Sequence, residues 1–382
     1  MSSDDSTTSP AQSKRPEGSP LFWHASRQWA KKIRGKLHYF GRCPHDEALA
    51  RYEQQKDDLH AGRSPREEDG LTVQRLCAKF LVSREAKLAC GELSQRAYAE
   101  YGLVCGRLRK YLGAGRLVSD LRPDDFARLR QAMAATWGPL RLKAEIVRSR
   151  VPFNWAYKSG LLERPVLFGE EFSVPSLSVI RRHKAERGPR TFTADELRRL
   201  VAAASQPLKA MILLGVNCGY GNNDIARLPL KALDLPGGWV TFARPKTGIL
   251  RRCPLWPETV TALRSWLRRR PHPRSEVHDQ LVFVTKYGDA WNDASTITHE
   301  MRKLLDKLKI EGARNFYGLR HTTQTIGDAS GDLLAVRHIM GHASSDISST
   351  YRDTQGQNRI SDDRLRAVVL HLREWLFPKR KK

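Results

Sequence analysis

The chain has 382 residues, and its 66 lysines and arginines outnumber its 41 aspartates and glutamates, which leaves a formal net charge of +25. This length exceeds what a single hydrophobic core usually supports, so we expect two or three domains. The charge excess favours a polyanionic partner over a small acidic substrate. Hydrophobic residues make up 40% of the chain, which excludes wholesale disorder, and no apolar run approaches the length of about 18 residues that a membrane span requires.

The N-terminal part combines a polar tail with a small folded module. Residues 1–19 are rich in serine, threonine, aspartate and proline, so we expect a disordered tail and no export signal. In residues 20–66, apolar and basic residues alternate from Gln28 to Arg34 with the period of a strand, and Gly35 breaks the run. The stretch from Asp46 to Leu59 then has helical spacing. This pattern predicts a β-β-β-α module.

Aromatic and basic residues are interleaved along this predicted ribbon. We expect the rings to gather mainly on one face, packed on the helix, while a basic edge stays free. A plain folding module is one interpretation, but the composition suits a sheet that lies in a DNA groove. The predicted DNA-binding residues of this arm-like module are Lys31, Lys32, Arg34 and Lys36.

Residues 70–165 have the spacing of helices, and we predict an all-α domain of four or five of them. Val73, Leu76 and Phe80 recur on one helix face. Pro123 suits the first position of another helix, because the first amide of a helix needs no acceptor within that helix.

Prolines and glycines recur in residues 166–190, where we predict an extended linker. A basic cluster in this segment contains Arg181, Arg182 and Lys184. Such clusters are usually solvated charge, but on so basic a chain contact with DNA phosphates is a second interpretation.

Residues 191–382 predict a second large domain. Thr193, followed three residues later by Glu196, is the capping box of a helix start. The apolar run 211–216 suits a buried central helix. Further helices are expected at residues 259–269, 294–309, 333–340 and 365–376.

A short hairpin is predicted within this domain. Residues 239–242 and 251–255 have the composition of strands, and the segment 245–248 between them contains the proline and glycine of a turn. Lys246 is therefore expected at the tip of the hairpin.

Several short pieces of sequence follow one another in a fixed order here. Lys246 is followed by Tyr317-Gly318-Leu319-Arg320-His321-Thr322, then by Met340-Gly341-His342, and then by Tyr351. Each piece is weak alone, but together they resemble the tyrosine recombinase (phage integrase) family over roughly residues 71–355. The resemblance implies that the all-α domain is a core-binding domain and that a mixed α/β catalytic domain follows it. The expected fold class is mainly α with small β elements.

The resemblance also implies cleavage and rejoining of duplex DNA, with a role for each matching residue. Tyr351 is the implied nucleophile, which forms a covalent phosphotyrosine and so needs neither a metal nor another cofactor. Arg320 would bind the phosphate through two N–H groups, since cations must face the charge that develops on phosphorus. Lys246 would protonate the leaving 5′ oxygen, and His342 would hold a non-bridging oxygen or move the proton of the nucleophile. Tyr317 stands where the family has histidine and can still donate a hydrogen bond to phosphate.

The family's first arginine is missing from its expected place. The aligned stretch after the buried helix has Gly221 in that slot, while Asp224 fits the acidic position that follows. A phosphate clamped by arginine would therefore have one clamp in place of two. Arg227 lies about 240° further round a helix, so Arg244 or Arg252 beside the hairpin is at least as good a replacement. Arg244 is also a predicted DNA contact.

The sequence thus predicts a site-specific DNA recombinase or integrase that acts on double-stranded DNA through a 3′-phosphotyrosine, as a homo-oligomer (a tetramer) and away from membranes. Two alternatives stay open: a DNA-binding relative that lost catalysis with the first arginine, and type IB topoisomerase-like strand relaxation. The six cysteines show no metal-binding spacing, which favours a reduced, cytoplasmic protein. The apolar stripe of the last helix would by default pack on its own domain, whereas the resemblance suggests docking on a neighbouring protomer.

Overall fold

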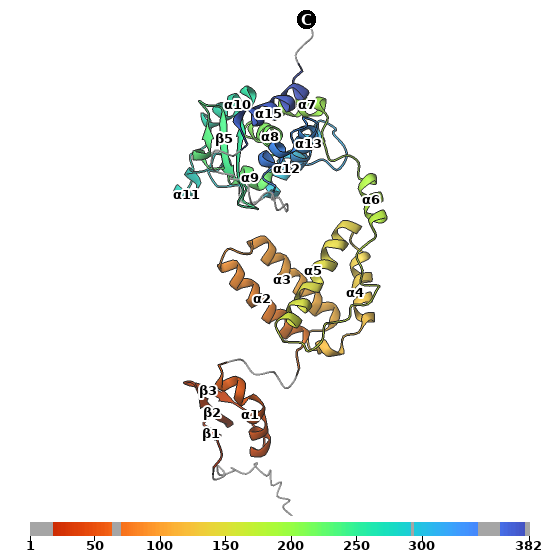
Figure 1. Ribbon diagram of the computed structural model, residues 1–382, viewed down its shortest axis with the longest axis vertical. Coiled ribbons are helices and arrows are strands. Elements are labelled where there is room, and N and C mark those ends of the chain that lie inside the picture. Colours follow the sequence, from red (N-terminus) through yellow and green to blue (C-terminus); the bar gives the residue numbers. More distant parts are fainter. Residues whose placement is uncertain (1–17, 63–69, 292–293, 343–359, 379–382) are drawn as a thin grey trace, which may run out of the picture. The chain divides into compact units, whose positions relative to one another are not determined.

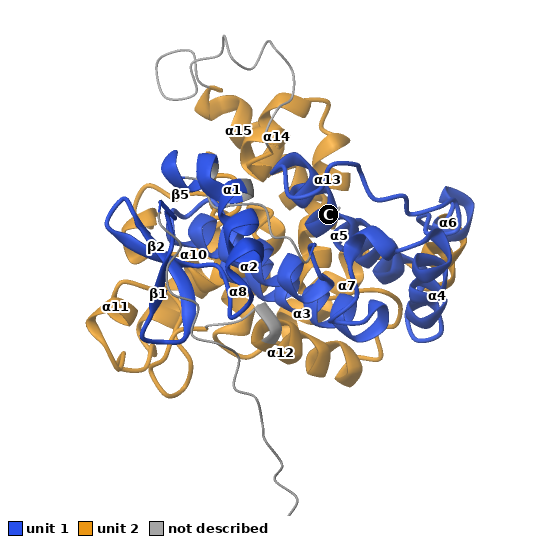
Figure 2. Ribbon diagram, turned by 90° about the horizontal axis from the view of Figure 1, so that it is seen from below, with its two compact units in different colours: residues 1–180 blue, residues 181–382 orange. Residues whose placement is uncertain are grey.

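The computed structural model describes residues 18–62, 70–291, 294–342 and 360–378 (Figure 1). Helices predominate in these ranges, and their strands form two antiparallel sheets of three strands each. The expected fold class, mainly α with small β elements, is confirmed. The chain divides into two compact units, residues 1–180 and 181–382 (Figure 2). No helix in the described ranges is long and apolar enough to cross a membrane.

The predicted β-β-β-α module is present in residues 18–62. Its elements are β1 (Phe22–His24), β2 (Gln28–Ile33), β3 (Lys36–Tyr39) and α1 (His45–His60). Arg34 and Gly35 have φ angles of 49° and 83°, as a two-residue type I′ hairpin turn requires. Trp29 and Ile33 are buried together with Tyr52 of α1. One face of the sheet therefore packs on the helix.

Aromatic rings lie on both faces of this sheet, so the expectation that they gather mainly on one face is wrong. Directly opposed residues share a face, and the row of Phe22, Ala30 and Tyr39 therefore lies on the side away from Trp29. On that outer side Leu37 and Tyr39 are more than two fifths exposed. The expectation failed because it rested on the alternation within β2, while these rings come from the edge strands.

The helical bundle in the rest of this unit matches the predicted all-α region. Its elements are α2 (Val73–Ala89), α3 (Gln95–Leu112), the short 3₁₀ helix η1 (Val118–Asp120), α4 (Pro123–Ala134) and α5 (Pro139–Lys158). Pro123 occupies the first turn of α4, as predicted. Asp125 in the same turn accepts a hydrogen bond from the Arg122 amide at 2.8 Å and one from the Arg116 guanidinium at 2.7 Å. The hydrogen bond from Arg116 is the main reason that the pKa of Asp125 falls to about 2.

The segment 166–190 is not an extended linker. Phe172 is fully buried in the core of the helical bundle, and the Arg150 guanidinium donates a hydrogen bond to its carbonyl. Further on, the chain forms α6 (Leu177–Glu186), which carries the predicted basic cluster. Prolines and glycines suggested an extended chain, but a buried aromatic ring and a ten-residue run without either of these helix breakers outweigh them.

The second unit begins its main fold at α7 (Ala194–Ala203), whose capping box is formed as predicted. The Thr193 amide donates to the Glu196 carboxylate at 2.9 Å, and the Glu196 amide donates to the Thr193 hydroxyl at 3.2 Å. The remaining elements are α8 (Leu208–Asn217), α9 (Asn222–Ala226), η2 (Leu230–Ala232), β4 (Leu233–Asp234), β5 (Trp239–Ala243), β6 (Leu250–Pro254), α10 (Pro257–Leu267), α11 (Glu276–Asp279), α12 (Ala294–Lys307), α13 (Phe316–Asp328), α14 (Leu333–Met340) and α15 (Asp362–Leu376).

Helix α8 is the buried central helix of this unit, in agreement with the prediction for its apolar run. It is buried from Ala210 to Asn217 and contacts α7, α10, α13 and α15. The sheet of β4, β5 and β6 is antiparallel, and β6 contacts α14 and α15. This arrangement brings the end of α8, the β5–β6 hairpin and the end of α14 to one place.

The apolar stripe of α15 packs within the chain. Leu365, Val368 and Leu372 are buried in the core of the second unit. The indole N–H of Trp256 donates to the carbonyl of Val369 at 2.9 Å. The default expectation for this stripe is therefore correct, and its apolar side chains are used inside the unit.

Candidate active site

Arg320 occupies the centre of the candidate site. It lies in the second turn of α13 and is only 2% exposed. Its guanidinium donates to the carbonyl of Gly219, just after α8, at 2.7 Å and to the carbonyl of Met340, at the end of α14, at 2.5 Å. Burial, and then the positive charge of Arg244, lowers its pKa to about 10. Arg320 therefore stays charged at neutral pH and is fixed in place by two other elements.

A second guanidinium, that of Arg251 on β6, is buried next to this centre. Arg251 is fully buried, and it donates to the Asp224 carboxylate at 2.9 Å and to the Phe242 carbonyl at 3.2 Å. Its guanidinium also lies 4.3 Å from the centre of the Tyr220 ring. Its Nη1 atom has no hydrogen-bond partner among the described residues. Arg251 and Asp224 both act electrostatically on Arg320, so the carboxylate that pairs with Arg251 also offsets part of the charge of Arg320.

Gly341 and His342 follow α14 and adjoin the same cluster. Gly341 ends the helix with φ of +59°, and a Cβ atom there would lie 2.6 Å from Cδ of Arg251, so the position requires glycine. Partial burial, and then the charges of Arg320 and Arg244, lower the pKa of His342. Its imidazole is therefore neutral at pH 7 and can accept a proton.

The β5–β6 hairpin brings two predicted site residues to the cluster. The Arg244 guanidinium and the Thr247 hydroxyl donate to the Gly341 carbonyl at 3.1 and 3.3 Å. Lys246 lies between them in the turn, as predicted, and its side chain is exposed. The hairpin is thus anchored beside His342, while the ammonium group of Lys246 is free to reach a bound substrate.

The three replacements expected for the missing arginine have different surroundings. Arg244 acts electrostatically on both Arg320 and His342. Arg252 instead pairs with Asp362 and lies 3.7 Å from the ring centre of Trp239. Arg227, at the end of α9, is exposed. The expectation for Arg252 is wrong because the side chains of β6 alternate, which turns Arg251 and Cys253 inward.

Arg251 was not recognised from the sequence. The signal that could have found it is the period of two along β6, since Cys253 was expected to be a packing residue. A cysteine that points inward places Arg251, two residues earlier, on the same buried face.

Gly221 lies at the start of α9 beside Tyr317. The Gly221 amide donates to the Asp224 carboxylate at 2.8 Å, so this carboxylate holds the start of the helix. The Tyr317 ring is 5.3 Å from the His321 ring, centre to centre, in an edge-on contact. Tyr351, the predicted nucleophile, lies outside the described residues.

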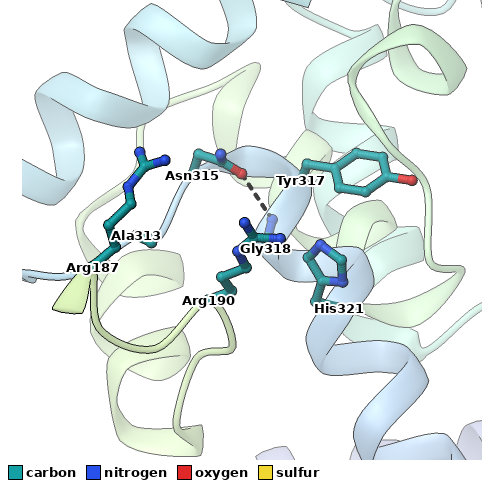
Figure 3. Close-up of a pocket in the computed structure, with 7 residues that line it drawn as sticks. All are labelled: Arg187, Arg190, Ala313, Asn315, Tyr317, Gly318 and His321. Carbon is teal, nitrogen blue, oxygen red and sulfur yellow. Dashed lines mark hydrogen bonds between the residues drawn. The ribbon is translucent and has the colours of Figure 1, made fainter. Parts of the chain in front are cut away.

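A cavity of about 310 Å³ opens at the start of α13, next to this cluster (Figure 3). Its lining residues are Arg187, Arg190, Ala313, Asn315, Tyr317, Gly318 and His321. No acidic side chain lines it. Partial burial, and then the charges of Arg190 and Arg320, lower the pKa of His321. His321 therefore lines the cavity and is also influenced by Arg320 of the candidate active site.

The predicted DNA-binding residues outside this cluster differ in exposure and in whether they already have a hydrogen-bond partner. Lys31 donates to the Tyr52 hydroxyl at 2.6 Å and lies over the ring of the same residue. The three other cations predicted to contact DNA in this module are exposed: Lys32, Arg34 and Lys36. On α6 the exposed cations are Arg181, Arg182 and Lys184.

Known proteins resemble the chain in sequence and in fold. Residues 190–358 match the model of the phage integrase family. The tyrosine recombinase XerC of Salmonella typhi is 26% identical over 286 residues, which cover 68% of this chain and 93% of that protein. XerC of Alcanivorax borkumensis is 26% identical over 184 residues, 46% of this chain, and the chain spans only 59% of its length.

A solved structure extends the likeness to both compact units. A lambda integrase dimer bound to a COC′ core site has a TM-score of 0.55 and 15% identity with the chain, and the comparison covers 91% of this chain and 99% of that one. The range matched by the family model contains the buried Arg320, the hairpin with Lys246, and His342. Within the second unit, residues 190–358 therefore have the sequence pattern of the phage integrase family.

Proposed function

We propose that this protein is a site-specific DNA recombinase or integrase that cuts and rejoins duplex DNA through a 3′-phosphotyrosine intermediate. The observation that carries the proposal is an excess of positive charge: the Asp224 carboxylate pairs with the buried Arg251, the buried Arg320 donates to backbone carbonyls, and the half-buried Arg244 adds a third guanidinium. A buried charge without a counter-ion costs on the order of several kcal/mol. A phosphodiester bound at Arg320 supplies the missing negative charge.

We assign each group a step in transesterification. The Tyr351 oxygen attacks phosphorus while its proton passes to the neutral imidazole of His342, and the bond from phosphorus to the 5′ oxygen breaks. Lys246 gives a proton to that leaving oxygen. Arg320, helped by the Tyr317 hydroxyl, stabilises the negative charge that develops on the non-bridging oxygens. The reverse sequence with a different 5′ hydroxyl rejoins the strand, and the bond to Tyr351 conserves the energy for it.

The exposed cations would hold the duplex around this site. Lys32 lies opposite Leu37 on the outer sheet face, which also carries exposed Tyr39, and Arg34 and Lys36 lie at the adjoining hairpin turn. This arrangement suits a sheet placed in a DNA groove. Arg181, Arg182 and Lys184 on α6, and Lys31 to a lesser degree, would add phosphate contacts.

Strand exchange needs more than one active site, so we propose that the protein works as a homo-oligomer on DNA, with four copies joining two duplexes. The solved lambda integrase complexes include a dimer on a core site and a tetramer on a Holliday junction, which supports such an assembly. We place the activity in the cytoplasm, where the free thiols of all six cysteines would persist.

The test is a duplex that spans an end junction of the element encoding the chain and carries a nick beside the cleavage position. The wild-type protein should form a covalent adduct with this DNA without added metal or nucleotide, and Tyr351→Phe should form none while binding the duplex with nearly unchanged affinity. Tight binding by the wild type without an adduct would instead indicate the non-catalytic DNA-binding relative. The matching relatives are recombinases, so strand relaxation of the topoisomerase type is not favoured.

A further inference from the structure

Tyr317 rests directly on the backbone of Gly221. A Cβ atom added at Gly221 would lie 3.0 Å from both Cδ2 and Cε2 of the tyrosine ring, which is closer than side-chain carbons normally approach one another. The edge-on contact with His321 borders the ring from within α13. The absence of a side chain at position 221 is thus what leaves room for the ring.

The phenol of Tyr317 lies near Arg320 on α13 and points away from the arginines of the cavity. Figure 3 shows the hydroxyl of Tyr317 directed away from Arg187 and Arg190. Tyr317 precedes Arg320 by three residues on α13, so the two side chains emerge on neighbouring parts of the helix surface. Tyr317 also acts electrostatically on Arg320.

Gly221 itself is held firmly. Its amide donates to one oxygen of Asp224 at 2.8 Å, and the other oxygen of Asp224 accepts from Arg251 at 2.9 Å. Both Asp224 and Arg251 are buried. A new side chain at position 221 would therefore move the half-exposed ring of Tyr317 and leave the loop in place.

We propose that Gly221 is a positioning residue that seats the Tyr317 ring, so that the phenol hydroxyl donates to the same phosphate as Arg320. The inference rests on the proposed function. The two residues depend on each other. The phenol ring of Tyr317 fills the space that a larger side chain at position 221 would take, and its hydroxyl supplies a neutral hydrogen-bond donor there. The positive charge comes from the guanidinium groups of Arg320, Arg251 and Arg244.

The test is a double-mutant cycle of Gly221→Ala and Tyr317→Phe, read as the rate of covalent adduct formation on the nicked duplex. Tyr317→Phe keeps the ring and removes only the donor, so the rate should fall about tenfold. Gly221→Ala should cause a similar loss because it displaces the ring. The double variant should lose no more than the more impaired single variant, since the donor can be lost only once. Losses that multiply, or an unchanged rate in Gly221→Ala, would overturn the proposal.

Gly106→Ala is the matched control for an added methyl group. Gly106 lies within α3, and a Cβ atom there meets nothing within 4 Å, so this variant should keep the wild-type rate. If Gly221→Ala lowers the unfolding temperature, adding Tyr317→Ala should restore it, because the contact is with the ring. A temperature that stays low in that double variant would place the strain elsewhere and contradict the proposed seating.

The same variants separate this inference from the proposed function. A wild-type protein that forms no adduct would refute the cleavage reaction. The cycle is then read in the affinity for the intact duplex, where the two single variants should weaken binding by similar factors and the double variant by no more. Independent, multiplying losses in affinity would overturn the role of Gly221 even though the protein binds DNA.

Discussion

Two groups of cations in this protein differ in their surroundings. The guanidinium groups of Arg320 and Arg251 are buried and donate to backbone carbonyls and to Asp224. On the N-terminal module, Lys32 and Lys36 are exposed to solvent. Water and salt screen exposed charges, whereas buried ones act at nearly full strength and in a fixed direction. The first group suits one phosphate in one position, and the second suits a duplex of any sequence.

The largest effect that would sharpen this contrast is on stability. Arg251→Met should lower the free energy of unfolding by about 3–5 kcal/mol, because it leaves the buried carboxylate of Asp224 unpaired. Adding Asp224→Asn should recover part of the loss. Lys32→Met should change stability by less than about 0.5 kcal/mol. Denaturant unfolding measures all three, and equal effects of Arg251→Met and Lys32→Met would remove the distinction between the two groups.

A second effect concerns the reaction rate. Arg320→Ala should slow adduct formation by more than tenfold, which corresponds to the loss of about 2–4 kcal/mol of transition-state stabilisation. Affinity for the duplex should change much less, because the exposed cations still hold the DNA. Single-turnover kinetics on the nicked duplex gives the rate, and an unaffected rate would mean that the phosphate is held elsewhere.

The pH dependence tests the electrostatic coupling inside the buried group. His342 acts in its neutral form, and its pKa is lowered by burial and by Arg320 and Arg244. Because the imidazole is already neutral at pH 7, small changes of pH around 7 should not change the rate. The rate should fall only when the pH drops below the lowered pKa and His342 becomes protonated. Arg244→Met removes a nearby positive charge, raises the pKa of His342 and should shift this acid limb to higher pH. A limb that moves to lower pH, or does not move, would contradict the coupling.

The smallest effect separates cations within the N-terminal module. Each phosphate contact steepens the dependence of log affinity on log salt by about 0.9. Neutralising Lys32, Arg34 and Lys36 together should therefore reduce the slope by the amount expected for two to three phosphate contacts. Lys31→Gln should flatten it by less than one, because its ammonium group already bonds to Tyr52. A slope unchanged by the triple variant would make the module a folding or protein-contact element.

Local sequence signals predicted much of the fold. The capping box of Thr193 and Glu196, the proline at the start of α4 and the apolar run of α8 depend on neighbouring residues, and each is found as expected. The order of Lys246, Arg320 and His342 pointed to the family because these positions follow one another along the chain. Signals of this kind need no knowledge of tertiary contacts.

The errors arose where distant residues decide the outcome. Phe172 is buried by the helical bundle, and so the proline-rich segment around it is not extended. Arg251 lies inside the cluster and Arg252 outside it, which depends on how β6 packs against the end of α14. The contact between Gly221 and Tyr317 joins residues that are far apart in the sequence, and the two substitutions looked like separate departures from the family pattern.

The central claim is that the buried cations around Arg320 support cleavage of DNA although position 221 carries no arginine. The most direct measurement is the mass of the proteolytic peptide that contains Tyr351 after the wild-type protein has reacted with the nicked duplex and the DNA has been digested. We predict an added nucleotide joined to Tyr351 through a 3′ phosphate. An unmodified Tyr351 peptide from protein that binds the same duplex tightly would contradict the claim.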